Sequence, residues 1–173
     1  MLRLASYDVV FQEIPGEVTL ALNLANCPNR CEGCHSPHLQ EDKGTVLDED
    51  GLSGLLASYG SAVTCVCFLG GDAEPVEVAK LAAFLKRRES SAVDGSLSGA
   101  VRGIPLKVGW YSGCDRLPDG FDLTNFDYVK IGSYKQELGG LASSKTNQRM
   151  YRLANGKMED ITALFWEKPL PCR

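Results

Sequence analysis

The stretch "VTLALNLANCPNRCEGCHSPH", residues 18–38, joins a short apolar segment to three closely spaced cysteines. The segment "VTLALNL", residues 18–24, is flanked by turn-forming residues and predicts a β-strand. Cys27, Cys31 and Cys34 follow on a loop with the spacing C-x3-C-x2-C. Thiolates this close together favour a soft metal or an iron–sulfur cluster. The stretch therefore predicts a strand that leads into a metal-binding loop.

Three kinds of metal site fit this cysteine loop. A 4Fe–4S cluster held by three cysteines leaves one iron free to bind a substrate or cofactor. A structural zinc site would add His38 as its fourth ligand. A ferredoxin-like electron carrier would take a fourth cysteine from elsewhere in the chain, and the candidates are Cys65, Cys67, Cys114 and Cys172. The spacing alone leaves all three open.

Beyond the cysteine loop, helix-like and strand-like segments alternate. Residues 47–60 and 74–88 carry apolar side chains at helical spacing, and residues 62–72, 104–112 and 126–132 predict buried strands. This alternation predicts an α/β fold with a mostly parallel sheet, in the form of a partial, open β/α barrel. The 173 residues predict a single domain, and they are too few for a complete eight-stranded barrel of about 250 residues.

The sequence "LGGD", residues 69–72, follows the second predicted strand as the cysteine loop follows the first. Ligands bind beyond the carboxyl ends of parallel strands, so both motifs are expected on the same rim. Gly70 and Gly71 let a ligand approach the backbone, and Asp72 offers a carboxylate to an ammonium group. A lone "GGD" is more often a plain strand-to-helix turn, in which Asp72 would cap the following helix.

Four further features are candidates with plainer alternatives. Ser112 and Lys130, near the ends of the third and fourth predicted strands, can contact a cofactor or be ordinary surface residues. Residues 139–150 form a polar, glycine-rich loop that can contact a partner or close on itself. Residues 89–103 are rich in serine and glycine and predict a mobile, exposed loop.

Charge and composition narrow the function classes. The net charge of −4 gives no general attraction to nucleic acid or to anionic membranes. Arg3, Asp8 and Glu13 interrupt the N-terminal segment, which argues against a signal peptide. The longest apolar run, residues 62–69, is far shorter than the about 20 residues that cross a membrane. The seven cysteines, an odd number, are expected to be reduced or metal-bound in a cytoplasmic protein.

"CPNRCEGC" after the first strand and "LGGD" after the second resemble the radical S-adenosylmethionine (SAM) enzymes. Gly33 departs from that family's common pattern, which has an aromatic residue before the third cysteine. This glycine, "GGD" in place of the usual "GGE", the short chain and "SSKTNQR" (residues 143–149) resemble one branch, the activating proteins of anaerobic ribonucleoside-triphosphate reductase. The resemblance extends from Gly16 to Arg149 and is strongest at the cysteine loop.

The resemblance implies a site and a reaction. Cys27, Cys31 and Cys34 would hold a 4Fe–4S cluster whose open iron binds SAM. Gly33, Cys34 and His35 would pass beside the adenine, Gly70, Gly71 and Asp72 would receive the methionine amino group, and Ser112 and Lys130 would contact the ribose or carboxylate.

In this family, an electron from the reduced cluster cleaves SAM to methionine and a 5′-deoxyadenosyl radical. The radical then removes a hydrogen atom from a glycine of the partner reductase. Reduced flavodoxin or ferredoxin is the usual electron donor. The alternatives are an activase of another glycyl radical enzyme, such as the pyruvate formate-lyase type, and a non-catalytic zinc or iron–sulfur module.

Overall fold

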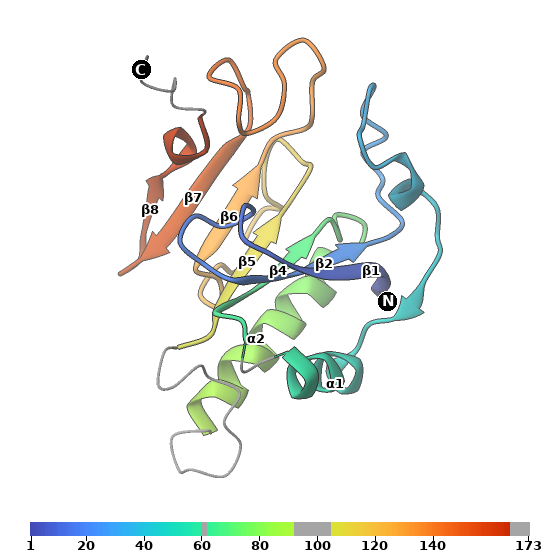
Figure 1. The fold of residues 1–173 in the computed structure, drawn as a ribbon, viewed down its shortest axis with the longest axis vertical. Helices are drawn as coiled ribbons and strands as arrows, with labels where there is room; N and C mark the ends of the chain where they lie inside the picture. Colours follow the sequence, from blue (N-terminus) through green and yellow to red (C-terminus); the bar gives the residue numbers. More distant parts are fainter. Residues whose placement is uncertain (60–61, 92–104, 167–173) are drawn as a thin grey trace, which may run out of the picture.

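The computed structural model describes residues 1–59, 62–91 and 105–166 and shows an α/β fold built on an eight-stranded sheet (Figure 1). The strands lie in the order β3-β1-β2-β4-β5-β6-β7-β8. Their bounds are β1 Arg3–Val10, β2 Thr19–Leu24, β3 Thr45–Val46, β4 Cys65–Leu69, β5 Lys107–Tyr111, β6 Tyr128–Ile131, β7 Arg149–Ala154 and β8 Lys157–Asp160. The four strands expected from the sequence are confirmed as β2, β4, β5 and β6.

The sheet is parallel at its centre and antiparallel on both sides. Strands β2, β4, β5 and β6 pair in parallel, whereas β1 and β3 on one side and β7 and β8 on the other pair antiparallel. Four of the seven pairings between described strands are antiparallel, so the expectation of a mostly parallel sheet is wrong. The physical reason is that loops without a crossover helix join β1 to β2, β6 to β7 and β7 to β8, and such connections return the chain antiparallel.

Two α-helices and two short 3₁₀ helices complete the described fold. They are α1 Glu49–Tyr59, α2 Pro75–Ser91, η1 Pro37–Gln40 and η3 Thr162–Phe165, and the two expected helices are confirmed. The loop expected at 89–103 is partly wrong, because its first three residues continue α2, and the rest lies outside the described residues. Within the described ranges, no helix combines the length and the apolar character needed to span a bilayer.

The two faces of the sheet are covered in different ways. On β4, Val66 and Phe68 face a core that includes buried residues of α1 and α2, because side chains alternate along a strand. Cys65 and Cys67 point to the opposite face and pack with Ile14 of the β1–β2 loop. These two cysteines are fully buried core residues, and burial raises the pKa of both thiols. The second face is therefore covered by loops rather than by α-helices.

Candidate functional site

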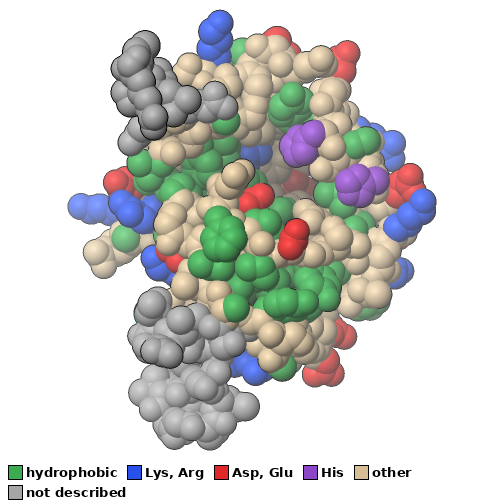
Figure 2. Space-filling model, viewed as in Figure 1, with side chains coloured by type: hydrophobic (Ala, Val, Ile, Leu, Met, Phe, Trp, Pro, Cys, Tyr) green, Lys and Arg blue, Asp and Glu red, His purple; other side chains and the backbone are tan. Residues whose placement is uncertain are grey.

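A cavity of about 490 Å³ lies at the carboxyl ends of the four parallel strands. Its lining includes Leu24 at the end of β2, Leu69 at the end of β4, Tyr111 at the end of β5 and Lys130 on β6. Figure 2 shows a hollow on one face of the molecule, with histidine side chains beside it. The cysteine loop and "LGGD" both contribute to this lining, so the two motifs share one rim of the sheet.

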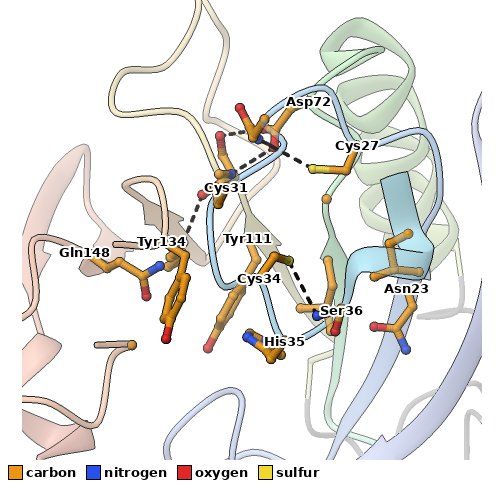
Figure 3. A pocket seen from close by; sticks show the side chains of 18 of the residues that line it. Asn23, Cys27, Cys31, Cys34, His35, Ser36, Asp72, Tyr111, Tyr134 and Gln148 are labelled. Atoms are coloured by element: carbon orange, nitrogen blue, oxygen red, sulfur yellow. Dashed lines mark hydrogen bonds between the residues drawn. The ribbon is translucent and has the colours of Figure 1, made fainter. Parts of the chain in front are cut away.

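The cysteine loop brings three free thiols to the cavity. Cys27, Cys31 and Cys34 all line it, are partly exposed and form no disulfide (Figure 3). The start of the loop is held in place because Cys27 N donates a hydrogen bond to the carbonyl of Leu39, in the helix η1, at 2.9 Å. The sulfur of Cys34 accepts a hydrogen bond from Ser36 N at 3.4 Å. The loop thus has a defined backbone shape that presents its thiols to one space.

The donor set can be compared with the candidate metal groups. No three His, Cys, Asp or Glu side chains within residues 1–59, 62–91 and 105–166 are arranged to hold a single metal ion. In a 4Fe–4S cluster each cysteine binds a different iron, so the thiols need not meet at one point. Three free, partly exposed thiols around a cavity fit such a cluster in number and kind. His38, the fourth ligand of the zinc alternative, is not part of the cavity lining.

Asp72 connects three loops around the cavity. Its Oδ1 accepts a hydrogen bond from Ser112 Oγ at 2.6 Å, and its Oδ2 accepts from Asn29 Nδ2 at 2.7 Å and from Gly113 N at 2.8 Å. Asn29 belongs to the cysteine loop, and Ser112 and Gly113 follow β5. All three donors lie outside α2, so the helix-cap alternative does not describe these contacts.

The predicted glycines play different parts in the structure. Gly70 lines the cavity, but its carbonyl already accepts a hydrogen bond from Trp110 Nε1 at 2.8 Å. Gly71 is not in the lining, and at its φ of 86° an added Cβ would lie 2.6 Å from Val78 Cγ2. Gly33 also lies outside the lining, with a φ of 68° that L side chains rarely adopt, and an added Cβ would lie 2.6 Å from Gln136 Oε1. Gly33 and Gly71 therefore allow positive φ angles, and Gly71 also allows close packing against Val78.

Lys130 is a buried cation in the cavity wall. It is 6% exposed, and its Nζ donates to Gly132 O at 2.7 Å and to Ser112 O at 3.2 Å. Burial lowers the pKa of this ammonium to about 8, while the Asp72 carboxylate acts in the opposite direction. Buried ionisable groups in a cavity often mark functional sites. The predicted residue His35 also lines the cavity, where its ring makes an edge-to-face contact with Tyr134 at 6.0 Å between centroids.

Two lining residues that the sequence did not single out, Glu13 and Tyr111, are joined by a hydrogen bond. Glu13, on the β1–β2 loop, has a buried Oε2 with no hydrogen-bond partner among the described residues. The hydroxyl of Tyr111 donates to the Glu13 backbone carbonyl, and burial raises the pKa of Tyr111 well above its ordinary value. A buried carboxylate oxygen without a donor is costly, so this wall has an acceptor that a ligand can satisfy.

The polar loop before β7 mostly closes on itself. Within the loop, Thr146 Oγ1 donates to Gly139 O at 3.3 Å and Arg149 donates to Thr146 O at 2.7 Å. Asn147 Nδ2 instead donates to Ser133 O, outside the loop, at 2.9 Å. Three residues of the loop also line the cavity, namely Gly140, Leu141 and the buried Gln148. The loop therefore closes largely on itself and also forms part of the cavity wall, and its contact with a partner or cofactor stays a prediction.

Comparisons of the chain with protein-family models, with curated proteins and with solved structures found no significant match.

Proposed function

We propose that this protein is a radical SAM activase that generates a glycyl radical on anaerobic ribonucleoside-triphosphate reductase. The observation that carries the proposal is the shared lining of one cavity by the three cysteines of the C-x3-C-x2-C loop and by Asp72 of "GGD". These motifs lie far apart in the sequence, and the hydrogen bond from Asn29 to Asp72 joins them directly.

Cys27, Cys31 and Cys34 would hold the 4Fe–4S cluster. When bound, the cluster and SAM supply the one-electron cleavage of the sulfonium and the radical that attacks the partner's glycine. The protein's part is to bind and orient the cofactor and to exclude competing reactions.

The cavity walls offer groups suited to each end of SAM. Asp72 Oδ1 accepts a hydrogen bond from Ser112, and a carboxylate oxygen can accept a further one, here from the ligand's ammonium group. Lys130 has three N–H donors, of which two bond carbonyl groups, and the third can meet a carboxylate. His35 and Tyr134 give the cavity an aromatic wall suited to a flat base.

The arrangement of the layers fits a partial, open β/α barrel. The parallel strands β2, β4, β5 and β6 would form its wall, with α1 and α2 outside and the cavity within. An open barrel leaves its rim accessible to a loop of the partner reductase. A reduced flavodoxin or ferredoxin would supply the electron, in the cytoplasm, where thiols stay reduced.

The test starts with protein reconstituted anaerobically with iron and sulfide. We expect a brown protein with broad sulfur-to-iron absorption. Adding SAM to the reduced protein should change the electron paramagnetic resonance (EPR) spectrum of the cluster and release methionine. With anaerobic ribonucleoside-triphosphate reductase present, a glycyl radical signal should appear. Colourless protein with stoichiometric zinc, or an unchanged spectrum with saturating SAM, would overturn the proposal.

A matched pair of cysteine variants provides the control. Cys31→Ala should lose the cluster, because Cys31 lines the cavity and is one of the three proposed ligands. Cys67→Ala should keep the iron and sulfide content of the wild type, because Cys67 is buried in the core on β4. Equal loss of iron in both variants would argue against a cluster on the loop.

A further inference from the structure

Asn29 lies between the first two cysteines and contacts Cys27 of its own loop and two other segments of the site. Its Nδ2 donates to Asp72 Oδ2 at 2.7 Å and to Cys27 Sγ at 3.7 Å. Its Oδ1 accepts a hydrogen bond from Cys114 Sγ at 3.7 Å. Figure 3 shows Asp72 and Cys27 next to each other, with a dashed line ending on the Cys27 sulfur. One amide thus joins the "GGD" carboxylate to a predicted cluster ligand.

The orientation of this amide follows from its partners. A carboxylate only accepts hydrogen bonds, so the nitrogen of Asn29 must face Asp72. The reversed amide would put its oxygen against the Asp72 carboxylate and its nitrogen toward Cys114. An amide nitrogen carries two hydrogens, so it can donate one to Asp72 and the other to Cys27.

We propose that Asn29 is a positioning residue that fixes Asp72 relative to Cys27 and raises the reduction potential of the cluster. This inference rests on the proposed function. Hydrogen bonds donated to a cluster's cysteine sulfur favour the more negative, reduced cluster and so tune its potential. Cys34 receives its hydrogen bond from a backbone N–H, of Ser36. The hydrogen bond to Cys27 comes from a side chain, so substitution can remove it.

Gly113 provides the space that the Asn29 amide occupies. A Cβ added at Gly113 would lie 2.4 Å from Asn29 Nδ2, which is far inside van der Waals contact. The backbone N–H of Gly113 also donates to Asp72 at 2.8 Å. Gly113→Ala therefore displaces the amide of Asn29 while leaving residue 29 unchanged, which makes it an independent probe of the same contact.

The test is an EPR-monitored redox titration of cluster-loaded protein. In Asn29→Ala, the equilibrium constant for reduction should fall by about threefold to tenfold, the range expected for one hydrogen bond. Asn29→Asp keeps the shape of the side chain but lacks the donor, so its potential should fall at least as far. Gly113→Ala should shift the potential in the same direction. The matched control is Asn23→Ala, because Asn23 lines the same cavity but donates to Ser6 Oγ at 3.1 Å.

The outcomes separate the inference from the proposed function. A wild-type protein that takes up no cluster refutes both the proposed function and the inference about Asn29. A cluster-loaded protein whose potential is the same in wild type, Asn29→Asp and Gly113→Ala overturns the inference alone. A lower potential in Asn29→Ala with a wild-type value in Asn29→Asp also overturns it, since side-chain volume rather than the donor would then be responsible. If Asn29→Ala loses its iron, the reduction potentials of Asn29→Asp and Gly113→Ala show whether the hydrogen bond to Cys27 tunes the cluster.

Discussion

Replacing Asp72 with asparagine should weaken SAM binding while leaving the protein almost as stable as the wild type. The new amide can place its oxygen where Oδ2 lies and accept from Asn29 and Gly113. Its nitrogen then faces Ser112 Oγ, a hydroxyl that already accepts from Cys114 N at 3.0 Å and has a second lone pair. All three contacts survive, so we expect the free energy of unfolding to fall by about 1 kcal/mol or less.

Asp72→Ala gives the contrasting result, because it removes the common acceptor of three donors. Each hydrogen bond to a charged group is worth 1.5–3 kcal/mol, but the cavity lets water reach part of the site, so we expect a total loss of about 2–4 kcal/mol in the free energy of unfolding. Both variants lose the charge that the ligand's ammonium group would meet. The lost hydrogen bond from the ammonium group is also worth about 1.5–3 kcal/mol, so the affinity of each variant for SAM should fall by about tenfold to a hundredfold.

Isothermal titration of SAM into cluster-loaded protein and urea unfolding of the same samples measure the two quantities. Asp115→Asn is the control, because Asp115 accepts two hydrogen bonds from Ser133 but does not line the cavity. Unchanged SAM affinity in Asp72→Asn would remove Asp72 from the ligand site. Unchanged stability in Asp72→Ala would refute the argument from three converging hydrogen bonds.

Three further predictions concern other residues around the cavity. Cys114→Ala should keep its iron, because burial and the charge of Asp72 both raise the pKa of Cys114 and so keep it a thiol. Iron loss as complete as in Cys31→Ala would instead favour a four-cysteine electron carrier. Lys130 has a pKa of 10.5 in the unfolded chain and of about 8 in the folded protein, so only the folded protein loses this proton between these pH values. The free energy of unfolding of the wild type relative to that of Lys130→Met should therefore rise by about 3 kcal/mol from pH 8 to pH 10.5. If urea unfolding gives the same difference at both pH values, the charge of Lys130 is not buried. Glu13→Gln should raise the free energy of unfolding by about 1 kcal/mol, because it removes a charge with a buried, unpaired oxygen; lower stability on urea unfolding would show that the carboxylate has a donor in the folded protein.

The central strands and both helices could be predicted because their signals are local. The run that became β4 is continuous and apolar, and the run that became β2 is apolar apart from Thr19 and Asn23, as is typical of strands buried on both faces. The cavity followed from the same reasoning, since the ends of parallel strands lie on one edge of a sheet. The grouping of the cysteine loop with Asp72, Ser112 and Lys130 around the cavity was thus within reach of the sequence.

The flanking strands were missed for different reasons. Strand β1, "RLASYDVV", mixes polar and apolar residues and is largely exposed, so its apolar pattern is weak. The β7–β8 hairpin did carry a usable signal. Asn155 and Gly156 connect the two strands with φ of 53° and 70°, and Asn-Gly is the preferred pair for such a two-residue turn. The loops that join β1 to β2 and β6 to β7 are longer than a two-residue turn, so no short turn motif marks these two antiparallel pairings in the sequence.

The flanking strands β1, β7 and β8 bring further residues into the lining of the cavity. Glu13 reaches the cavity because β1 and β2 form a hairpin, Gln148 because the chain turns back from β6 into β7, and Phe165 because η3 follows β8. None of these residues is bonded to the thiols or to Asp72 in the contacts described above. The parallel centre therefore positions the groups proposed for the cluster and the ammonium, while the antiparallel flanks shape the remaining wall. We expect substitutions on the flanks to change which ligand or polypeptide fits the cavity, and substitutions at the parallel centre to change whether the cluster and SAM bind at all.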